Sequence, residues 1–216
     1  MRIFLCGQRS FGRAALDVCA GHEIAGVCSP DANDRLTSEA TNRRLPWIAS
    51  GSLNAGTLPA EVDLIIAAHS HDFIGRATRL RCRLGAIGYH PSLLPRHRGR
   101  DAVAWTIRMG DAVTGGSVYW LSDAVDSGDI AAQDWCFVRP GDTAGDLWRR
   151  DLFPMGLRLL ASVLKSLAAG VMVRIPQDQA LATWEPAITG VPKLRRPDLP
   201  MLTDGRDIGY AVIRER

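Results

Sequence analysis

The feature that most constrains the fold is the apolar run Val-Asp-Leu-Ile-Ile-Ala-Ala at residues 62–68. It is too short for a buried helix and rich in β-branched residues, so it predicts a strand buried on both faces. Residues 3–6, 23–28, 46–49 and 85–89 predict further strands, separated by segments with helical character at 11–20 and 30–44. Alternating strands and helices predict βαβ units, and hence a Rossmann-like α/β fold with a mainly parallel twisted sheet.

The pattern changes after residue 90. Asp101 is predicted to cap a helix through residue 108, with Gly110 as its stop, and Ser10 to cap the helix at 11–20. Residues 115–121 and 130–138 predict two strands joined by a short loop, an antiparallel pair added to the parallel core. A long amphipathic helix should start at Asp142 or Thr143 and reach residue 169, with Pro154 kinking or splitting it.

The end of the chain is predicted to be irregular from residue 175 onward. We expect residues 1–188 to form one domain and residues 189–216 to be an extended tail packed on it, closing with a short helix at 204–216. The helical stripe Leu157, Leu160, Leu164 and Leu167 is predicted to be core.

Composition excludes several classes of protein. The net charge of +3 is too small to indicate nucleic-acid binding. Five scattered cysteines without a Cys-x-x-Cys pair predict reduced, mostly buried thiols and a cytoplasmic location. We find no apolar stretch approaching 18 residues and no signal-peptide pattern at the start, and therefore expect no membrane partner.

Two polar residues stand out as a candidate catalytic pair. His90 begins a Pro-rich loop directly after a predicted strand, in the segment Tyr-His-Pro-Ser-Leu-Leu-Pro-Arg-His-Arg-Gly at 89–99. Asp126 lies in a Gly-containing turn before the strand at 130–138. If the two strands adjoin, the pair can act as a general acid and base. Taken alone, His90 could instead bond a backbone carbonyl, and Asp126, like Asp129, could be an ordinary turn residue.

The order of these motifs resembles the formyltransferase family, whose members use 10-formyltetrahydrofolate. The similarity is closest to the branch of N-terminal hydrolase domains of 10-formyltetrahydrofolate dehydrogenases. It rests on the segment at 89–99, on Gly-Gln-x-x-Phe-Gly at 7–12, on Leu-Phe-Pro at 152–154 and on Ala-Thr-Trp-Glu at 182–185. The resemblance implies the formyltransferase fold, with 10-formyltetrahydrofolate as co-substrate.

The resemblance also implies a set of site residues. The catalytic set of the family is an Asn, a His two residues later and a distant Asp; here His90 and Asp126 match, and Gly88 stands in the place of the Asn. The folate-contacting segment of the family falls on Asp72, Phe73 and Ile74, and Asp126 borders the same site. A missing oxyanion donor typically costs about 10²–10³ in rate. We therefore expect a compensating water near Gly88, a more reactive acceptor or a slower enzyme.

The acceptor stays open at this point. The resemblance implies transfer to a small amine, such as a sugar or a hydroxylated amino acid, with water as the alternative acceptor and a non-catalytic folate-binding module as a third reading. Transfer to tRNA is disfavoured, because the chain has no room for the extra domain of that subfamily. A homodimer is left open.

Two further groups of polar residues have competing readings. His69-x-His71 has no third ligand with suitable spacing, so we predict no metal. Arg96, Arg98 and Arg100 could bind an anionic acceptor or the glutamate tail of folate, and a solvated basic loop is equally favoured.

Overall fold

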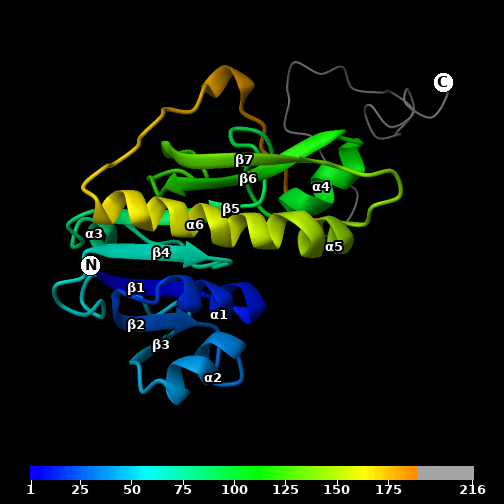
Figure 1. Cartoon of the computed structure of the whole chain (residues 1–216). Helices are drawn as coiled ribbons and strands as arrows, with labels where there is room; N and C mark the ends of the chain where they lie inside the picture. The colour runs from blue at the N-terminus through cyan, green and yellow to red at the C-terminus, as the bar shows by residue number, and fades with distance from the viewer. Residues whose placement is uncertain (189–216) are drawn as a thin grey trace, which may run out of the picture.

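The computed structural model describes residues 1–188, which form one seven-stranded sheet with helices packed against it (Figure 1). The strand order is β3 (Trp47–Ala49), β2 (Glu23–Ser29), β1 (Arg2–Gly7), β4 (Leu64–Ala68), β5 (Gly85–His90), β6 (Val113–Trp120) and β7 (Ile130–Phe137). The first five strands of that order, from β3 through β5, run parallel to one another, whereas β6 and β7 pair antiparallel at the β5 edge. The predicted fold class is confirmed.

The two faces of the sheet bury different side chains, because successive strand residues point to opposite sides. One face carries Ile3, Leu5, Ile66 and Ile87, each no more than 1% exposed. Helices α1 (Arg9–Val18), α2 (Arg35–Asn42) and α6 (Phe153–Ala168) contribute to the same core cluster. Full burial of an aliphatic side chain is worth about 1.5–3 kcal/mol, so this layer is the main source of stability.

The opposite face has a smaller core and carries the candidate site. Phe4, Cys6 and Ile65 form this core together with Ile74, next to the short helix α3 (Arg76–Arg79), which the sequence analysis missed. Since Ile87 and Tyr89 belong to the helix-covered layer, Gly88 and His90 point the other way.

The cysteines agree with the expectation from the sequence. All five are free thiols, and four of them, Cys6, Cys19, Cys28 and Cys82, are buried. Among residues 1–188, no helix has the length and apolar character needed to cross a membrane.

Two predicted helix caps are wrong, although the helices exist. Helix α1 begins at Arg9 after Gln8, and the Ser10 hydroxyl accepts a hydrogen bond from Arg35 at 2.6 Å instead of capping. Helix α4 (Ala102–Met109) follows Asp101, whose left-handed backbone (φ 61°) turns its carboxylate away from the helix. That carboxylate accepts the backbone N–H of Ile188 at 2.9 Å. Capping depends on backbone geometry as well as residue type, which sequence spacing does not reveal.

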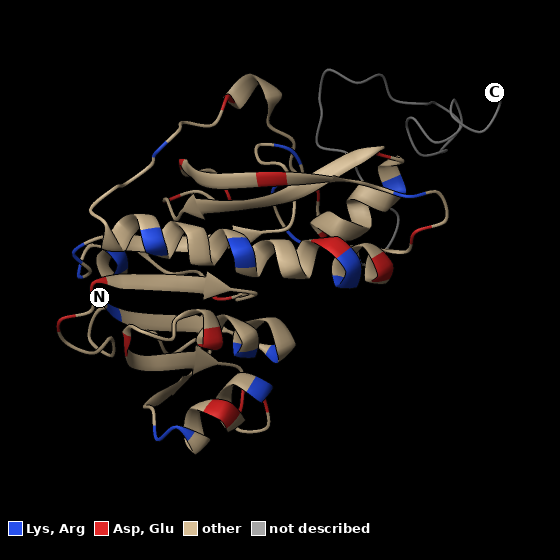
Figure 2. Ribbon diagram, in the orientation of Figure 1, with Lys and Arg blue, Asp and Glu red and all other residues tan. Residues whose placement is uncertain are grey.

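The long C-terminal helix is split, as predicted from Pro154. Helix α5 (Ala144–Leu147) begins with a capping box between Thr143 and Asp146, and a π-helical turn at Trp148–Leu152 leads into α6. Pro154 lies in the first turn of α6, where its missing N–H costs no helical hydrogen bond. Acidic and basic residues both occur along α5 and the π-helical turn (Figure 2), where Arg149 pairs with Asp146 and Arg150 with Asp142 and Asp151.

The predicted leucine stripe is largely confirmed. Leu160, Leu164 and Leu167 are buried in the main core cluster, whereas Leu157 is partly buried against it.

Residues 175–188 form a mostly irregular segment, the strap, which packs against the loop at 91–99. Ile175 exchanges two backbone hydrogen bonds with Ile130 of β7. The Arg98 N–H donates to the Thr183 carbonyl at 3.0 Å, and the Glu185 N–H donates to the Arg98 carbonyl at 3.2 Å. The predicted tail at 189–216 and its closing helix lie outside the described residues.

Candidate active site

The sheet brings the predicted catalytic pair together. His90 is the last residue of β5, and Asp126 lies in the loop between β6 and β7. Strand β6 runs antiparallel to β5 and ends with Trp120 opposite Ile87, so the loop after β6 folds back toward His90 to bring Asp126 beside it. His90 Nδ1 and Asp126 Oδ2 are 3.6 Å apart, and the two side chains are 9% and 12% exposed.

The ring of His90 has a defined orientation. Its Nε2 lies 2.7 Å from the main-chain oxygen of His97. A carbonyl oxygen only accepts, so Nε2 carries a proton and Nδ1 is the nitrogen that faces Asp126. The bond to a backbone carbonyl, which the sequence offered as the alternative to catalysis, is therefore what aims the ring. The 3.6 Å gap exceeds hydrogen-bond length and leaves Nδ1 available to a further proton donor or acceptor.

Asp126 is held from three directions. Its Oδ2 accepts the backbone N–H of Gly99 at 2.8 Å, and its Oδ1 accepts the hydroxyl of Tyr119 at 2.6 Å. The side-chain amide of Gln177 donates to the Asp126 carbonyl at 2.9 Å and to that of Gly128 at 2.7 Å. Asp126 itself has a left-handed backbone with φ 50°, a conformation that short polar residues tolerate. The carboxylate is thus placed by the tertiary structure as much as by its own turn.

The space beside Gly88 is filled by side chains. A Cβ atom at this position would lie 3.0 Å from Leu121 Cδ2 and 3.1 Å from Tyr119 Cε1. The expected room for a compensating water above Gly88 is therefore taken by a leucine and an aromatic ring. Gly88 joins the site as a close-packing position that carries no donor of its own.

The predicted folate segment follows β4 on the same face. The carboxylate of Asp72 accepts the Cys28 thiol at 3.3 Å and the Gly51 backbone N–H at 3.2 Å, so it is a structural anchor. Ile74 is buried, whereas the adjacent Phe73 is 65% exposed. Leu121, which borders Gly88, packs against the core cluster that contains Ile74. An apolar wall therefore runs from this segment toward the catalytic pair.

A buried network of charged side chains around His97, whose main-chain oxygen contacts His90, was not predicted from the sequence. The ring of His97 is 2% exposed and lies between Asp111, at 2.8 Å from Nε2, and Glu185, at 3.2 Å from Nδ1. Burial lowers the pKa of His97, but hydrogen bonds to the two carboxylates outweigh it, and the net pKa is raised. Burial raises the pKa of Asp111, and its partners His97 and Arg96 reverse this to a lowered pKa. Only the similar segment at 182–185 hinted at a role for Glu185.

Arg96, Arg98 and Arg100 lie in different environments. Neither prediction for them, anion binding or a solvated basic loop, describes all three. Arg96 makes a two-point contact with Asp111, at 2.9 and 2.7 Å. Arg98 is buried and donates to the side-chain oxygens of Gln177 and Gln179. Arg100 alone is exposed. Arg96 and Arg98 are thus structural, because their donors bind side chains of this chain.

His69 and His71 follow β4 at the point where the strand order reverses, next to the carboxyl end of β1. Ligands of open α/β sheets bind at such switch points. The two imidazole rings meet edge to face, 5.7 Å apart. Burial, followed by the charges of His71 and Arg9, lowers the pKa of His69 to about 4. Among the described residues no group of three potential ligands surrounds them.

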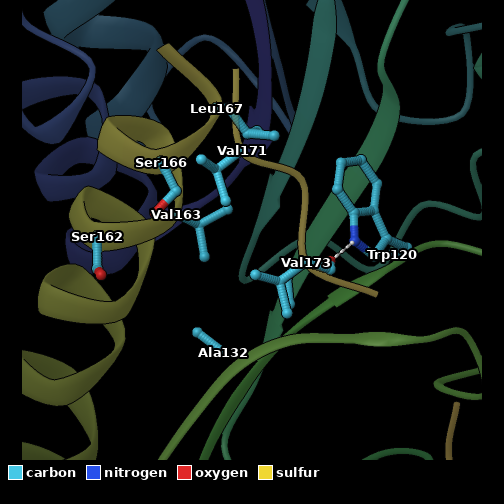
Figure 3. Close-up of a pocket in the computed structure, with 9 residues that line it drawn as sticks. Trp120, Ala132, Ser162, Val163, Ser166, Leu167, Val171 and Val173 are labelled. Carbon is cyan, nitrogen blue, oxygen red and sulfur yellow. Dashed lines mark hydrogen bonds between the residues drawn. The ribbon is translucent and has the colours of Figure 1, made fainter. Parts of the chain in front are cut away.

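A small pocket lies on the other face of the sheet (Figure 3). It is lined by Trp120 of β6, Ser162 and Ser166 of α6, and Val173, whose carbonyl accepts the indole N–H at 2.8 Å. Its lining residues include no acid, base or thiol.

Comparison with known proteins identifies the family of this chain. Residues 49–163 match the family described as "Formyl transferase". The chain is 46% identical over 201 residues to the mitochondrial 10-formyltetrahydrofolate dehydrogenase of Homo sapiens, and 36% identical over 207 residues to the cytosolic one. Each match covers 86% of this chain and 22% of the relative, so the chain spans about a fifth of the length of these relatives.

Solved structures show the same fold. A 4-N formyltransferase from Francisella tularensis superposes with a TM-score of 0.74 at 15% identity, over 86% of this chain and 76% of that one. At that identity the likeness establishes the fold alone. The match to more than half of the chain, together with the identities to the two dehydrogenases, shows that this protein belongs to the formyl transferase family.

Proposed function

We propose that this chain takes the formyl group of 10-formyltetrahydrofolate and transfers it to a small amine, using His90 and Asp126. The observation that carries the proposal is the facing of His90 Nδ1 and Asp126 Oδ2 at 3.6 Å. The pair lies at the carboxyl end of the sheet, in a chain of the formyl transferase family. Residues 1–188 would be the catalytic domain, and the described strap at 175–188 supports its site.

The proposed chemistry follows from which atoms of His90 and Asp126 can still contact the substrate. Attack by an amine nitrogen on the formyl carbon turns the formyl oxygen into an oxyanion and leaves a surplus proton on the nitrogen. Nδ1 of His90, when protonated, is the donor available to that oxyanion, because Nε2 is committed to His97. Asp126, the neighbouring base, accepts the surplus proton and returns it to the departing folate nitrogen.

The donor is proposed to bind along Asp72, Phe73 and Ile74. Asp72 is tied to Gly51 and Cys28, which fixes the backbone of this segment. The 65% exposed ring of Phe73 is free to pack against a flat heterocycle. The donor would supply the formyl carbon, and the protein would supply orientation, proton transfer and an apolar wall.

Hydrolysis, with water as the acceptor, is the second candidate. It is favoured by the 46% identity to a 10-formyltetrahydrofolate dehydrogenase, since the sequence resembles the hydrolase domain of that branch.

A tetrahydrofolate-release assay separates these candidates. The protein is incubated with 10-formyltetrahydrofolate, with and without candidate amines. Release that needs an amine supports transfer, and release without one supports hydrolysis. No release under any condition would indicate a folate-binding module.

A pair of histidine variants tests the role of His90. His90→Ala should abolish release while folate affinity stays within a few fold. The matched control is His22→Ala, a histidine next to β2 and outside the site. Full activity of His90→Ala would refute the assigned role.

A further inference from the structure

Tyr119 and Gly88 are direct neighbours across two strands. They are cross-strand partners in the β5–β6 pair, on the face that carries His90. The Tyr119 ring lies 3.1 Å from the position that a Cβ at residue 88 would occupy. The absence of a side chain at Gly88 is what gives the ring its room. The aromatic ring also meets His90 edge-on, with centroids 6.5 Å apart and planes at 86°.

The hydroxyl of Tyr119 ends on the carboxylate of Asp126. It donates to Oδ1 at 2.6 Å, while the Gly99 N–H donates to Oδ2 at 2.8 Å. With both oxygens engaged, the carboxylate has one orientation, and Oδ2 is the oxygen that faces His90 Nδ1.

Tyr119 is suited to act only as a donor. Its side chain is buried, with 7% of the residue exposed. Burial, followed by the nearby Asp126 charge, raises the pKa of the phenol well above its ordinary value. The hydroxyl therefore keeps its proton at neutral pH, and the tyrosine is the donor in the bond to Asp126.

We infer that Tyr119 is a positioning residue of the active site, which holds the Asp126 carboxylate aimed at His90, and that Gly88 is required so that the tyrosine ring can reach Asp126. This inference rests on the proposed role of the His90–Asp126 pair. It assigns a function to a strand residue that sequence analysis had passed over.

The test compares Tyr119→Phe with Tyr89→Phe in the tetrahydrofolate-release assay. Both tyrosines are 7% exposed and lie on neighbouring strands, and each phenylalanine removes a single hydroxyl. The Tyr89 hydroxyl, however, donates to the main-chain oxygen of Leu152 at 2.7 Å, in the helix-covered layer. Tyr89→Phe thus reports the cost of losing any buried tyrosine hydrogen bond, without a carboxylate.

Tyr119→Phe should lower kcat by about tenfold or more, the usual scale of a hydrogen bond to a charged group. The KM for the folate donor should stay within about twofold, because positioning acts on the reacting atoms. Tyr89→Phe should lower Tm by a similar amount to Tyr119→Phe and leave kcat close to that of the wild type, because its lost hydrogen bond is to a main-chain oxygen outside the site.

An unchanged kcat in Tyr119→Phe, or the same loss of kcat in both variants, would overturn the inference. Asp126→Asn separates this failure from failure of the proposed function. If Asp126→Asn and His90→Ala are inactive while Tyr119→Phe equals the wild type, the inference alone is wrong. If Asp126→Asn keeps wild-type turnover, the catalytic pair is wrong and Tyr119 has nothing to position.

Discussion

His90 Nε2 donates a 2.7 Å hydrogen bond to the main-chain oxygen of His97, seven residues further along the same loop. The orientation of the proposed catalytic imidazole therefore depends on the shape of the loop at 91–99. That loop is fixed in turn by the buried His97 side chain between Asp111 and Glu185. Residues distant from the reacting atoms thus control the geometry at Nδ1.

Asp126→Asn should reduce turnover by about 10²-fold or more, the usual contribution of a general acid–base group. The amide is close in size but carries no charge and cannot accept the proton of the nucleophile. Single-turnover release of tetrahydrofolate measures the effect. Asp129→Asn is the matched control, because its carboxylate is 37% exposed and lies 3.8 Å from Arg174, outside the pair. Equal losses in the two variants would argue against a specific role for Asp126.

Gly88→Asn should lower both stability and turnover, because the new side chain must displace Tyr119 and Leu121. Overpacking of this kind costs about 1–3 kcal/mol. Restoring an amide at this position is thus expected to harm the site instead of supplying a donor. Gly145→Ala is the control: its Cβ would meet only the flexible end of Arg149, at 3.3 Å, so it should be neutral or stabilising by up to about 1 kcal/mol. Denaturant unfolding compares the two, and faster turnover in Gly88→Asn would contradict the packing argument.

Arg98→Ala should destabilise the protein by about 2–3 kcal/mol, because it leaves the buried amide oxygen of Gln177 without its donor. Turnover should fall as well, since Gln177 holds the backbone of Asp126. Arg100→Ala, at an exposed position, should change the unfolding free energy by less than about 0.5 kcal/mol. Unfolding curves and the release assay together distinguish a structural role of Arg98 from anion binding. Loss of an anion-binding arginine would weaken substrate binding and leave the unfolding free energy unchanged.

Stability should decline as the pH rises above neutral through the titration of His97. Its folded-state pKa is raised above the ordinary 6.5, so the protonated ring favours the folded state. That contribution is complete below about pH 6.5 and is lost as the pH climbs through the folded-state pKa. Thermal unfolding between about pH 6 and 9 measures it. In His97→Asn, which cannot titrate, the slope over this window should flatten; an unchanged slope would assign it to another group.

The sequence indicated the layout of the sheet because its signals there are local and strong. The apolar run at 62–68 and the runs around Ile3 and Ile87 are largely buried on both faces, as is typical of the central strands of a mainly parallel sheet. Pro154 likewise split its helix as predicted, because the missing N–H is a property of the residue itself. The caps expected at Ser10 and Asp101 failed, because a cap needs a backbone geometry that tertiary contacts determine.

For the site, the sequence by itself determined which functional groups the chain carries and that His90 and Asp126 lie at the ends of strands expected to adjoin. Only the tertiary structure decided which atoms are free. It turned Nδ1 of His90 toward Asp126, placed the Tyr119 hydroxyl on the carboxylate, and buried His97 and Arg98 in supporting networks. The physical reason is that side-chain chemistry is a property of a residue, whereas direction, burial and partnership depend on atoms far apart in the chain.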